Sequence, residues 1–520
     1  MSLRWVYLIL VTCVALAGCS TTAAPTPPTG TPEPFAQSLA AFEVELEAVR
    51  QELKIPGMSA AVVKDGQLVW ARGLGYADVE NRVPAAAETP YHLASVTKTS
   101  AAVVVMQLVQ EGKLSLDDPV SHYGVTLPEG DKVLVRHLLS HTSDGTPGPR
   151  YEYNGDRYAL LSQVVLAATD RPLQDWLYER ILSPLGMENT APGPPSTCAG
   201  LSFAPTCERV YAALARPYIL DVDLNPVSGL YQDSYSAAAG LISTVVDLAK
   251  FDAALDANTL VTEATKELMW TPTVSTSGQT LPYGLGWFTQ VYRGTRLIWH
   301  YGFSPPSTST LFLKLPDEGL TFIVLANTDM LSRPVPWNEA DVLDSLPALT
   351  FYKRFVLAPR YDQPLPTIDW SSAELPLLTA ISHVEDEAVR DLLSKELQAR
   401  QGLASALAGV KEQLAHLGQM RATAEKLAQS LDPQMLDLHT GTYEFPEAGG
   451  LIVMVSRVEN KLYVTEPGGP SLELLPRSTT SFFVPAGYEF YQLDFVPDAA
   501  SGAARLVLTL YGMSFTGRRK

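Results

Sequence analysis

Ser95 and Lys98 are the two residues whose types and spacing could do chemistry. They are three apart at the start of residues 96–111, an apolar stretch that predicts a helix, so they would share one face a turn apart. Partial positive charge at a helix N-terminus favours an oxyanion developing beside such a serine. A lysine amine can take the serine proton if desolvation or another cation lowers its pKa. The alternative is a capping serine with a solvated lysine, since chance supplies roughly one S-x-x-K in a chain of this size.

Five longer segments place this pair in context. They are GMSAAVVKDGQLVWARGLGYADVENRVPAAAETPYHLASVTKTSAA, LVRHLLSHTSDG, YNGDRYALLSQVV, AAGLISTVVDLAKF and WHYGFSPPSTSTLFLKLPDEGLTFIVLANTD. Their order and spacing over about residues 36–330 resemble the serine β-lactamase and penicillin-binding protein superfamily. The closer likeness is to its class C β-lactamase-like branch, which includes D-alanyl peptidases and esterases. The resemblance implies that Ser95 is the nucleophile and Lys98 its base.

The second motif of that superfamily is Tyr-x-Asn ahead of a helix. Because a helix is expected from residue 157, the register assigns the tyrosine to Tyr153, with Tyr151 and Tyr158 as competitors. A tyrosine near a lysine can have a lowered pKa and act as acid and base. Gly155 stands where the superfamily has Asn, and the amide of Asn154 is a candidate to compensate. This departure weakens the expectation of β-lactam-like amide recognition.

The third motif is His300-Tyr301-Gly302, where relatives carry Lys-Thr-Gly or His-x-Gly on a strand edge. A glycine there lets a substrate backbone approach the strand. The resemblance implies that the N–H groups of Phe303 and Ser95 form the oxyanion hole. Neutral His300 binds a substrate carboxylate more weakly than lysine does. The other interpretation of His300 is a strand histidine satisfied by its neighbours.

No cofactor or metal is expected. His137 and His141 have a spacing compatible with zinc, but no third ligand is evident, and Walker A, G-x-S-x-G and C-x-x-C patterns are absent from the sequence. The 520 residues carry a net charge of -18, which argues against a partner such as DNA or RNA.

The first residues look like a targeting segment. Residues 1–18 hold an arginine and then an apolar run too short for a membrane span, and they end in Leu-Ala-Gly before Cys19. This resembles a bacterial lipoprotein signal, which implies a lipidated Cys19 and an extracytoplasmic protein anchored to a bacterial membrane. A plain signal peptide or a short uncleaved anchor is the alternative. Residues 19–35 are rich in Thr and Pro and predict a stiff tether.

Cys198 and Cys207 are the cysteines left in such a mature chain. In an extracytoplasmic compartment we expect them to form a disulfide, with two free thiols as the alternative.

The predicted fold is α+β. In residues 36–345, strand patterns at both ends and helices between them predict one antiparallel sheet flanked by helices, with a helical subdomain. Residues 346–432 predict a helical linker. Residues 433–520 show short alternating strands typical of a small β-barrel, and they resemble the lipocalin-like domains of some relatives.

The sequence therefore predicts an enzyme that forms an acyl-enzyme with a small ester, amide or peptide. Gly155, His300 and Tyr301 favour an esterase or a small D-amino-acid peptidase over a β-lactamase. Two other hypotheses are a sensor that binds a β-lactam or a peptidoglycan fragment without turnover, and a catalytically inactive adhesin.

Overall fold

The computed structural model describes residues 33–231, 234–361, 364–366, 368–446, 451–466, 471–497, 504–510 and 513–520. The predicted signal peptide, Cys19 and nearly all of the tether lie outside these ranges. Among the helices within them, none is both long enough and apolar enough to cross a bilayer.

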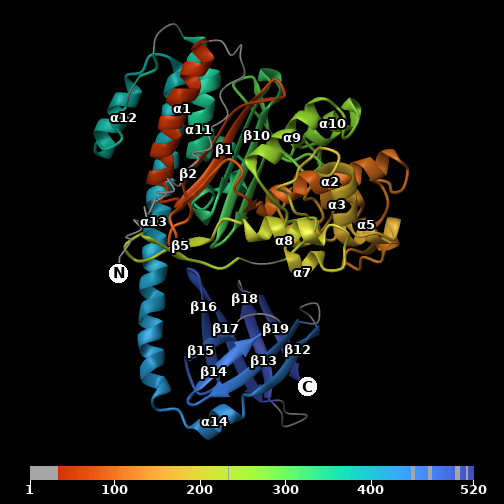
Figure 1. Ribbon diagram of the computed structural model, residues 1–520, viewed down its shortest axis with the longest axis vertical. Helices are drawn as coiled ribbons and strands as arrows, with labels where there is room; N and C mark the ends of the chain where they lie inside the picture. The colour runs from red at the N-terminus through yellow and green to blue at the C-terminus, as the bar shows by residue number, and fades with distance from the viewer. Residues whose placement is uncertain are drawn as a thin grey trace, which may run out of the picture.

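A seven-stranded antiparallel sheet is the centre of the larger domain (Figure 1). Its spatial order is β3-β2-β1-β11-β10-β9-β8, so both ends of the domain sequence build it, as predicted. Asp65 and Gly66 both have positive φ, the geometry of the tight hairpin turn that joins β1 to β2. The strands are β1 Gly57–Lys64, β2 Gln67–Asp78, β3 Val83–Pro84, β8 Phe288–Tyr292, β9 Thr295–Ser304, β10 Thr308–Leu315 and β11 Leu320–Ala326.

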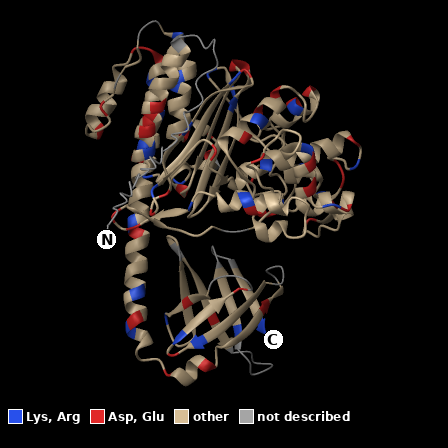
Figure 2. Cartoon of the chain, viewed as in Figure 1, with Lys and Arg blue, Asp and Glu red and all other residues tan. Residues whose placement is uncertain are grey.

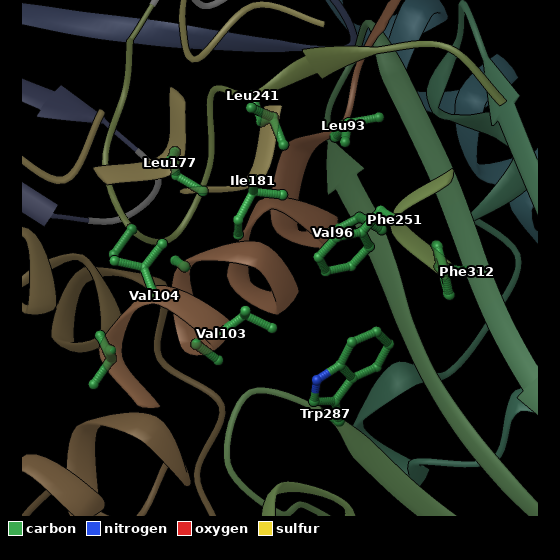
Figure 3. Close-up of a cluster of buried hydrophobic side chains, with 14 of the residues drawn as sticks. Leu93, Val96, Val103, Val104, Leu177, Ile181, Leu241, Phe251, Trp287 and Phe312 are labelled. Carbon is green, nitrogen blue, oxygen red and sulfur yellow. The ribbon is translucent and has the colours of Figure 1, made fainter. Parts of the chain in front are cut away.

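Both faces of this sheet are buried because successive side chains of a strand point to opposite sides. In β1, Ala61 and Val63 belong to one core and Ala60 and Val62 to the other. The first core packs against the helical subdomain, and Figure 3 shows Val96 and Val103, which follow Ser95 in the sequence, there with Phe251, Trp287 and Phe312.

The helical subdomain surrounds α2, which runs from Thr97 to Gln110 and is almost entirely buried. The 3-10 turn η1 Ala94–Val96 precedes it directly. A disulfide joins Cys198 to Cys207, with their Cα atoms 6.5 Å apart. The other helices are α3 Val135–Leu139, α4 Gly155–Ala159, α5 Leu161–Thr169, α6 Leu173–Leu177, α7 Pro195–Cys198, α8 Ala204–Ala212, α9 Val245–Asp256 and α10 Glu263–Trp270. Two short pairs, β4 Tyr91–His92 with β7 Ile242–Ser243 and β5 Tyr218–Leu220 with β6 Pro226–Ser228, complete this part.

The second core lies under α1 Glu33–Glu52, α11 Leu346–Tyr352 and the first part of α13 Glu387–Ala428. Phe351 of α11 stacks on Phe322 of the sheet with ring centroids 5.0 Å apart. The core of the sheet domain thus continues beyond residue 345, where we expected the helical linker to begin. All seven residues of α11 are buried, but a run this short and apolar suits a linker helix and a core helix alike, so the sequence did not distinguish them.

Helix α13 is a single helix of 42 residues, and it runs from the sheet domain along the side of a second domain (Figure 1). Figure 2 shows basic and acidic residues interspersed along it. The shorter helices α12 Glu374–Ser382 and α14 Pro433–Asp437 flank it. The second domain is a closed antiparallel barrel in sequence order, whose strands are β12 Gly441–Phe445, β13 Leu451–Val458, β14 Lys461–Thr465, β15 Ser471–Pro476, β16 Ser481–Ala486, β17 Glu489–Pro497, β18 Ala504–Leu510 and β19 Met513–Arg519.

Candidate active site

The nucleophile segment, residues 93–96 with Ser95 in it, packs directly against strand β9 of the sheet. Ser95 lies in η1, and Ala94 before it has a φ of 45°, a conformation that is strained for a residue with a Cβ. A Cβ built on Gly302 of β9 would lie 2.2 Å from the Leu93 carbonyl oxygen and 2.1 Å from Thr310 Oγ1. We expected this glycine to admit a substrate backbone. The structure shows that it also admits the chain that carries Ser95.

Lys98 is 1% exposed, and its Nζ donates to Ser95 Oγ at 2.8 Å and to the Ala238 carbonyl oxygen at 2.9 Å. Burial lowers the pKa of Lys98 from 10.5 to about 7, while the negative charge of Asp156 opposes the fall. Near neutral pH, therefore, a large fraction of this amine lacks a proton. A neutral amine at hydrogen-bond distance from a hydroxyl is the arrangement that general-base catalysis needs.

Tyr153 lies close to this pair. The Lys98 Nζ is 5.1 Å from the centre of its ring, and the Tyr153 side chain is half-buried against the second core. Burial and the neighbouring Tyr301 raise the pKa of Tyr153 well above its usual range, and the Ser95 hydroxyl only partly counters this. The expectation of a lowered pKa was wrong, because desolvation outweighs the attraction of a lysine that is itself partly neutral. Tyr153 is thus a neutral phenol, suited to relay a proton rather than to abstract one.

The two competing tyrosines have other surroundings. The Tyr158 hydroxyl donates to the Lys98 carbonyl oxygen at 3.1 Å, so it fixes the backbone of α2. Tyr151 stacks on Tyr283 with ring centroids 6.0 Å apart. The geometry therefore favours Tyr153 as the tyrosine of the site.

His141 supports Tyr153, a role that the sequence analysis missed. Its ring stacks on that of Tyr153 at 4.2 Å, and its Nδ1 accepts the Asn154 N–H at 3.1 Å. His137, the histidine four residues before His141, accepts the Leu134 N–H at the start of α3. Within the described ranges, no group of three His, Cys, Asp or Glu residues could hold a metal ion.

Comparison with known proteins shows the family of this chain. The model of the family called Beta-lactamase matches residues 45–343, more than half of the chain. The chain belongs to the beta-lactamase family. The human serine beta-lactamase-like protein LACTB, mitochondrial, is 44% identical over 115 residues, which are 21% of each chain. The putative penicillin-binding protein PbpX of Bacillus subtilis is 27% identical over 279 residues, 46% of this chain and 65% of PbpX.

The chain thus matches only about a fifth of the length of its LACTB relatives. Among solved structures, the octameric penicillin-binding protein homologue from Pyrococcus abyssi has a TM-score of 0.51 and 21% identity, and the match covers 92% of this chain and 100% of that one. At this identity the likeness concerns the fold, and it extends across both domains.

This member of the beta-lactamase family differs from our expectation at Asn154. Its side-chain oxygen accepts the Arg157 N–H at 3.0 Å and caps α4, and its Nδ2 donates to Asp144 at 3.1 Å. The Asn154 amide therefore does not replace the missing Asn at Gly155. A Cβ at Gly155 would have no atom within 4 Å, so that space is open.

His300 also departs from the expected role in substrate binding. It is fully buried, with Nε2 2.8 Å from the Tyr283 hydroxyl and Nδ1 2.6 Å from the Tyr301 carbonyl oxygen. Burial, together with the charge of Lys98, lowers the pKa of His300 well below its usual range. A neutral histidine with both nitrogens engaged does not serve as a carboxylate site, so we assign it to positioning β9 and Tyr283.

Proposed function

We propose that this protein is a serine acyl hydrolase that acts through a covalent acyl-enzyme at Ser95. The observation that carries the proposal is the buried Lys98 amine, 2.8 Å from Ser95 Oγ and with a pKa of about 7. A lysine that served only for stability would have little reason to lie inside the protein without a carboxylate partner, because burying an unpaired cation is costly.

The reaction follows from these groups. The neutral Lys98 amine accepts the Ser95 proton as Oγ attacks the substrate carbonyl carbon, and the carbonyl oxygen becomes an oxyanion. The backbone N–H groups of Ser95 and Phe303 stabilise that charge. The proton then passes from Lys98, through the neutral Tyr153 hydroxyl, to the leaving alkoxide or amine. A water molecule releases the acyl group by the reverse relay, and Ser95 recovers its proton.

The substrate class that we favour is a small ester or a short D-amino-acid peptide rather than a β-lactam. The Asn154 amide is occupied and His300 is buried, so two groups that would hold an amide and a carboxylate are missing. A small hollow lined by Ala94, Tyr231, Ser304 and others borders the residue that precedes Ser95. We propose that it receives a short acyl group.

A lipid anchor at Cys19 remains part of the proposal. The lipoprotein-like pattern of residues 1–19 supports an extracytoplasmic protein held on a bacterial membrane. Metabolic labelling with an alkyne fatty acid tests it, because Cys19→Ala should abolish incorporation.

Steady-state and burst kinetics on a substrate panel test the activity. We expect p-nitrophenyl acetate to be hydrolysed faster than p-nitrophenyl octanoate, D-alanine p-nitroanilide to be a slower substrate, and nitrocefin to be the poorest. Ser95→Ala should abolish all turnover while the protein stays folded. A stoichiometric burst without a steady state would favour the sensor instead, and unchanged hydrolysis by Ser95→Ala would exclude the mechanism.

A further inference from the structure

A tyrosine of the barrel domain is buried in the sheet domain. Tyr488 is at the tip of the hairpin between β16 and β17, and Figure 1 shows the β16 end of the barrel facing the sheet domain near β5. Tyr488 is 3% exposed and packs with the second core of the sheet domain rather than with the barrel interior. Its hydroxyl accepts the Leu220 N–H at 2.6 Å. At the same tip, a Cβ on Gly487 would lie 2.4 Å from Pro306 Cγ, so the contact is close.

Arg333 joins this tyrosine to the site. Its guanidinium carbon is 4.7 Å from the centre of the Tyr488 ring and 5.9 Å from that of Phe303. Arg333 Nε donates at 2.8 Å to Asp329, whose side chain is fully buried. The arginine is therefore held from the barrel side by an aromatic face and from the sheet side by a carboxylate.

The turn that carries Arg333 contacts the oxyanion strand directly. Ser332, 1% exposed, donates from Oγ to the Gly302 carbonyl oxygen at 3.0 Å. That carbonyl and the Phe303 N–H belong to one peptide group. Because a peptide is planar with its C=O and N–H pointing in opposite directions, a bond that fixes the carbonyl also fixes the N–H. The same bond polarises the peptide and strengthens the N–H as a donor.

We propose that the barrel domain positions the oxyanion hole: Tyr488 holds Arg333 and its turn, and Ser332 of that turn orients the Gly302–Phe303 peptide. This rests on the proposed hydrolase function, since Phe303 is assigned there as an oxyanion donor. The barrel interior is filled by its own side chains, among them Tyr443, Phe445, Phe482 and Phe495. The barrel is therefore better suited to contact the sheet domain through the tip of its β16–β17 hairpin than to bind a ligand in its interior.

Kinetics of matched variants in the full soluble chain test this inference. Ser332→Ala removes the hydroxyl that holds the peptide, and Ser345→Ala is its control, since Ser345 is equally buried and its hydroxyl has no partner among the described residues. Tyr488→Ala removes the hairpin contact, and Tyr463→Ala, on β14 of the barrel, is its control.

Removing one oxyanion donor outright costs about 10²–10³ in kcat, so misdirecting one should cost roughly tenfold. We expect Ser332→Ala to lower kcat for p-nitrophenyl acetate by about that factor with little change in KM, and to weaken inhibition by methylboronic acid, whose tetrahedral adduct uses the same hole. Tyr488→Ala should lower kcat roughly three- to tenfold, and the double variant should lose less than the product of both effects.

The results separate this inference from the function on which it rests. If wild type hydrolyses the ester and Ser332→Ala behaves like Ser345→Ala, the positioning role is wrong and the hydrolase remains. If Tyr488→Ala changes only the melting temperature, the barrel has no part in the oxyanion hole. If the wild type is inactive and its Ser95 is not acylated, the proposed function itself is wrong.

Discussion

Replacing Lys98 by methionine should raise the stability of the sheet domain at neutral pH and change how that stability depends on pH. The native amine has a pKa of about 7, whereas the unfolded chain returns it to 10.5. Between these values the unfolded state binds more protons than the native state, so the free energy of unfolding of the wild type rises with pH. Methionine has no proton to bind and removes this contribution.

The magnitude follows from the size of the pKa shift. A fall from 10.5 to about 7 corresponds to roughly 5 kcal/mol at 1.36 kcal/mol per pKa unit. From pH 7 to 9.5, the wild type should gain about 3 kcal/mol from this lysine alone. At pH 7 the variant should be the more stable protein, although the Ala238 carbonyl oxygen loses the Lys98 partner, at a cost of about 1–3 kcal/mol.

Guanidinium unfolding followed by tryptophan fluorescence reports on the sheet domain, because the barrel region, residues 433–520, contains no tryptophan. The difference between wild type and Lys98→Met should shrink as pH rises from 7 to 9.5. Ser95→Ala is the control, since it keeps the buried amine and should keep the slope of the wild type. If the free energy of unfolding changes equally with pH in wild type and in Lys98→Met, the conclusion that Lys98 is buried and partly neutral is refuted.

Three further predictions concern the same domain. Gly302→Ala should abolish acylation of Ser95, measured by burst kinetics, because its Cβ would lie 2.2 Å from a backbone oxygen that cannot move aside without displacing the nucleophile segment. Gly155→Asn should fold normally, since its Cβ meets no atom within 4 Å, and should raise hydrolysis of nitrocefin relative to that of p-nitrophenyl acetate; an unchanged ratio would contradict the role assigned to this position. Asp252→Ala removes the fully buried carboxylate beside Lys314 and leaves Asp256, 3.0 Å away, as its remaining acidic partner, so the free energy of unfolding should fall by up to about 3 kcal/mol, with urea unfolding as the measurement.

The main features of the fold and the pairing of Ser95 with Lys98 could be predicted from short stretches of the sequence. The Asp65-Gly66 turn predicted the first hairpin, and the three-residue spacing placed Lys98 beside Ser95. One available signal was overlooked: an Asn at a helix start, three residues before Arg157, is typical of an N-cap. That assignment would have shown that the Asn154 amide was already occupied.

Other features depend on burial or on contacts between distant segments. The pKa direction of Tyr153 depends on how much water surrounds it, which no neighbouring residue in the sequence reveals. The Leu220–Tyr488 bond joins residues 268 apart, and the Ser332–Gly302 bond joins a turn to strand β9 with no shared sequence pattern. Such pairings arise from the packing of whole domains, so periodicity and motif spacing do not contain them.

Labelling of the full soluble chain with a fluorophosphonate, read by intact mass and peptide mapping, tests the central claim most directly. An activated nucleophile beside a neutral lysine predicts one adduct, on Ser95, whose rate of formation rises with pH through about 7 as Lys98 loses its proton. Ser95→Ala should take up no label, and Lys98→Met should react far more slowly at every pH. A folded wild-type protein that forms no adduct, or one that labels at another residue, would contradict the account.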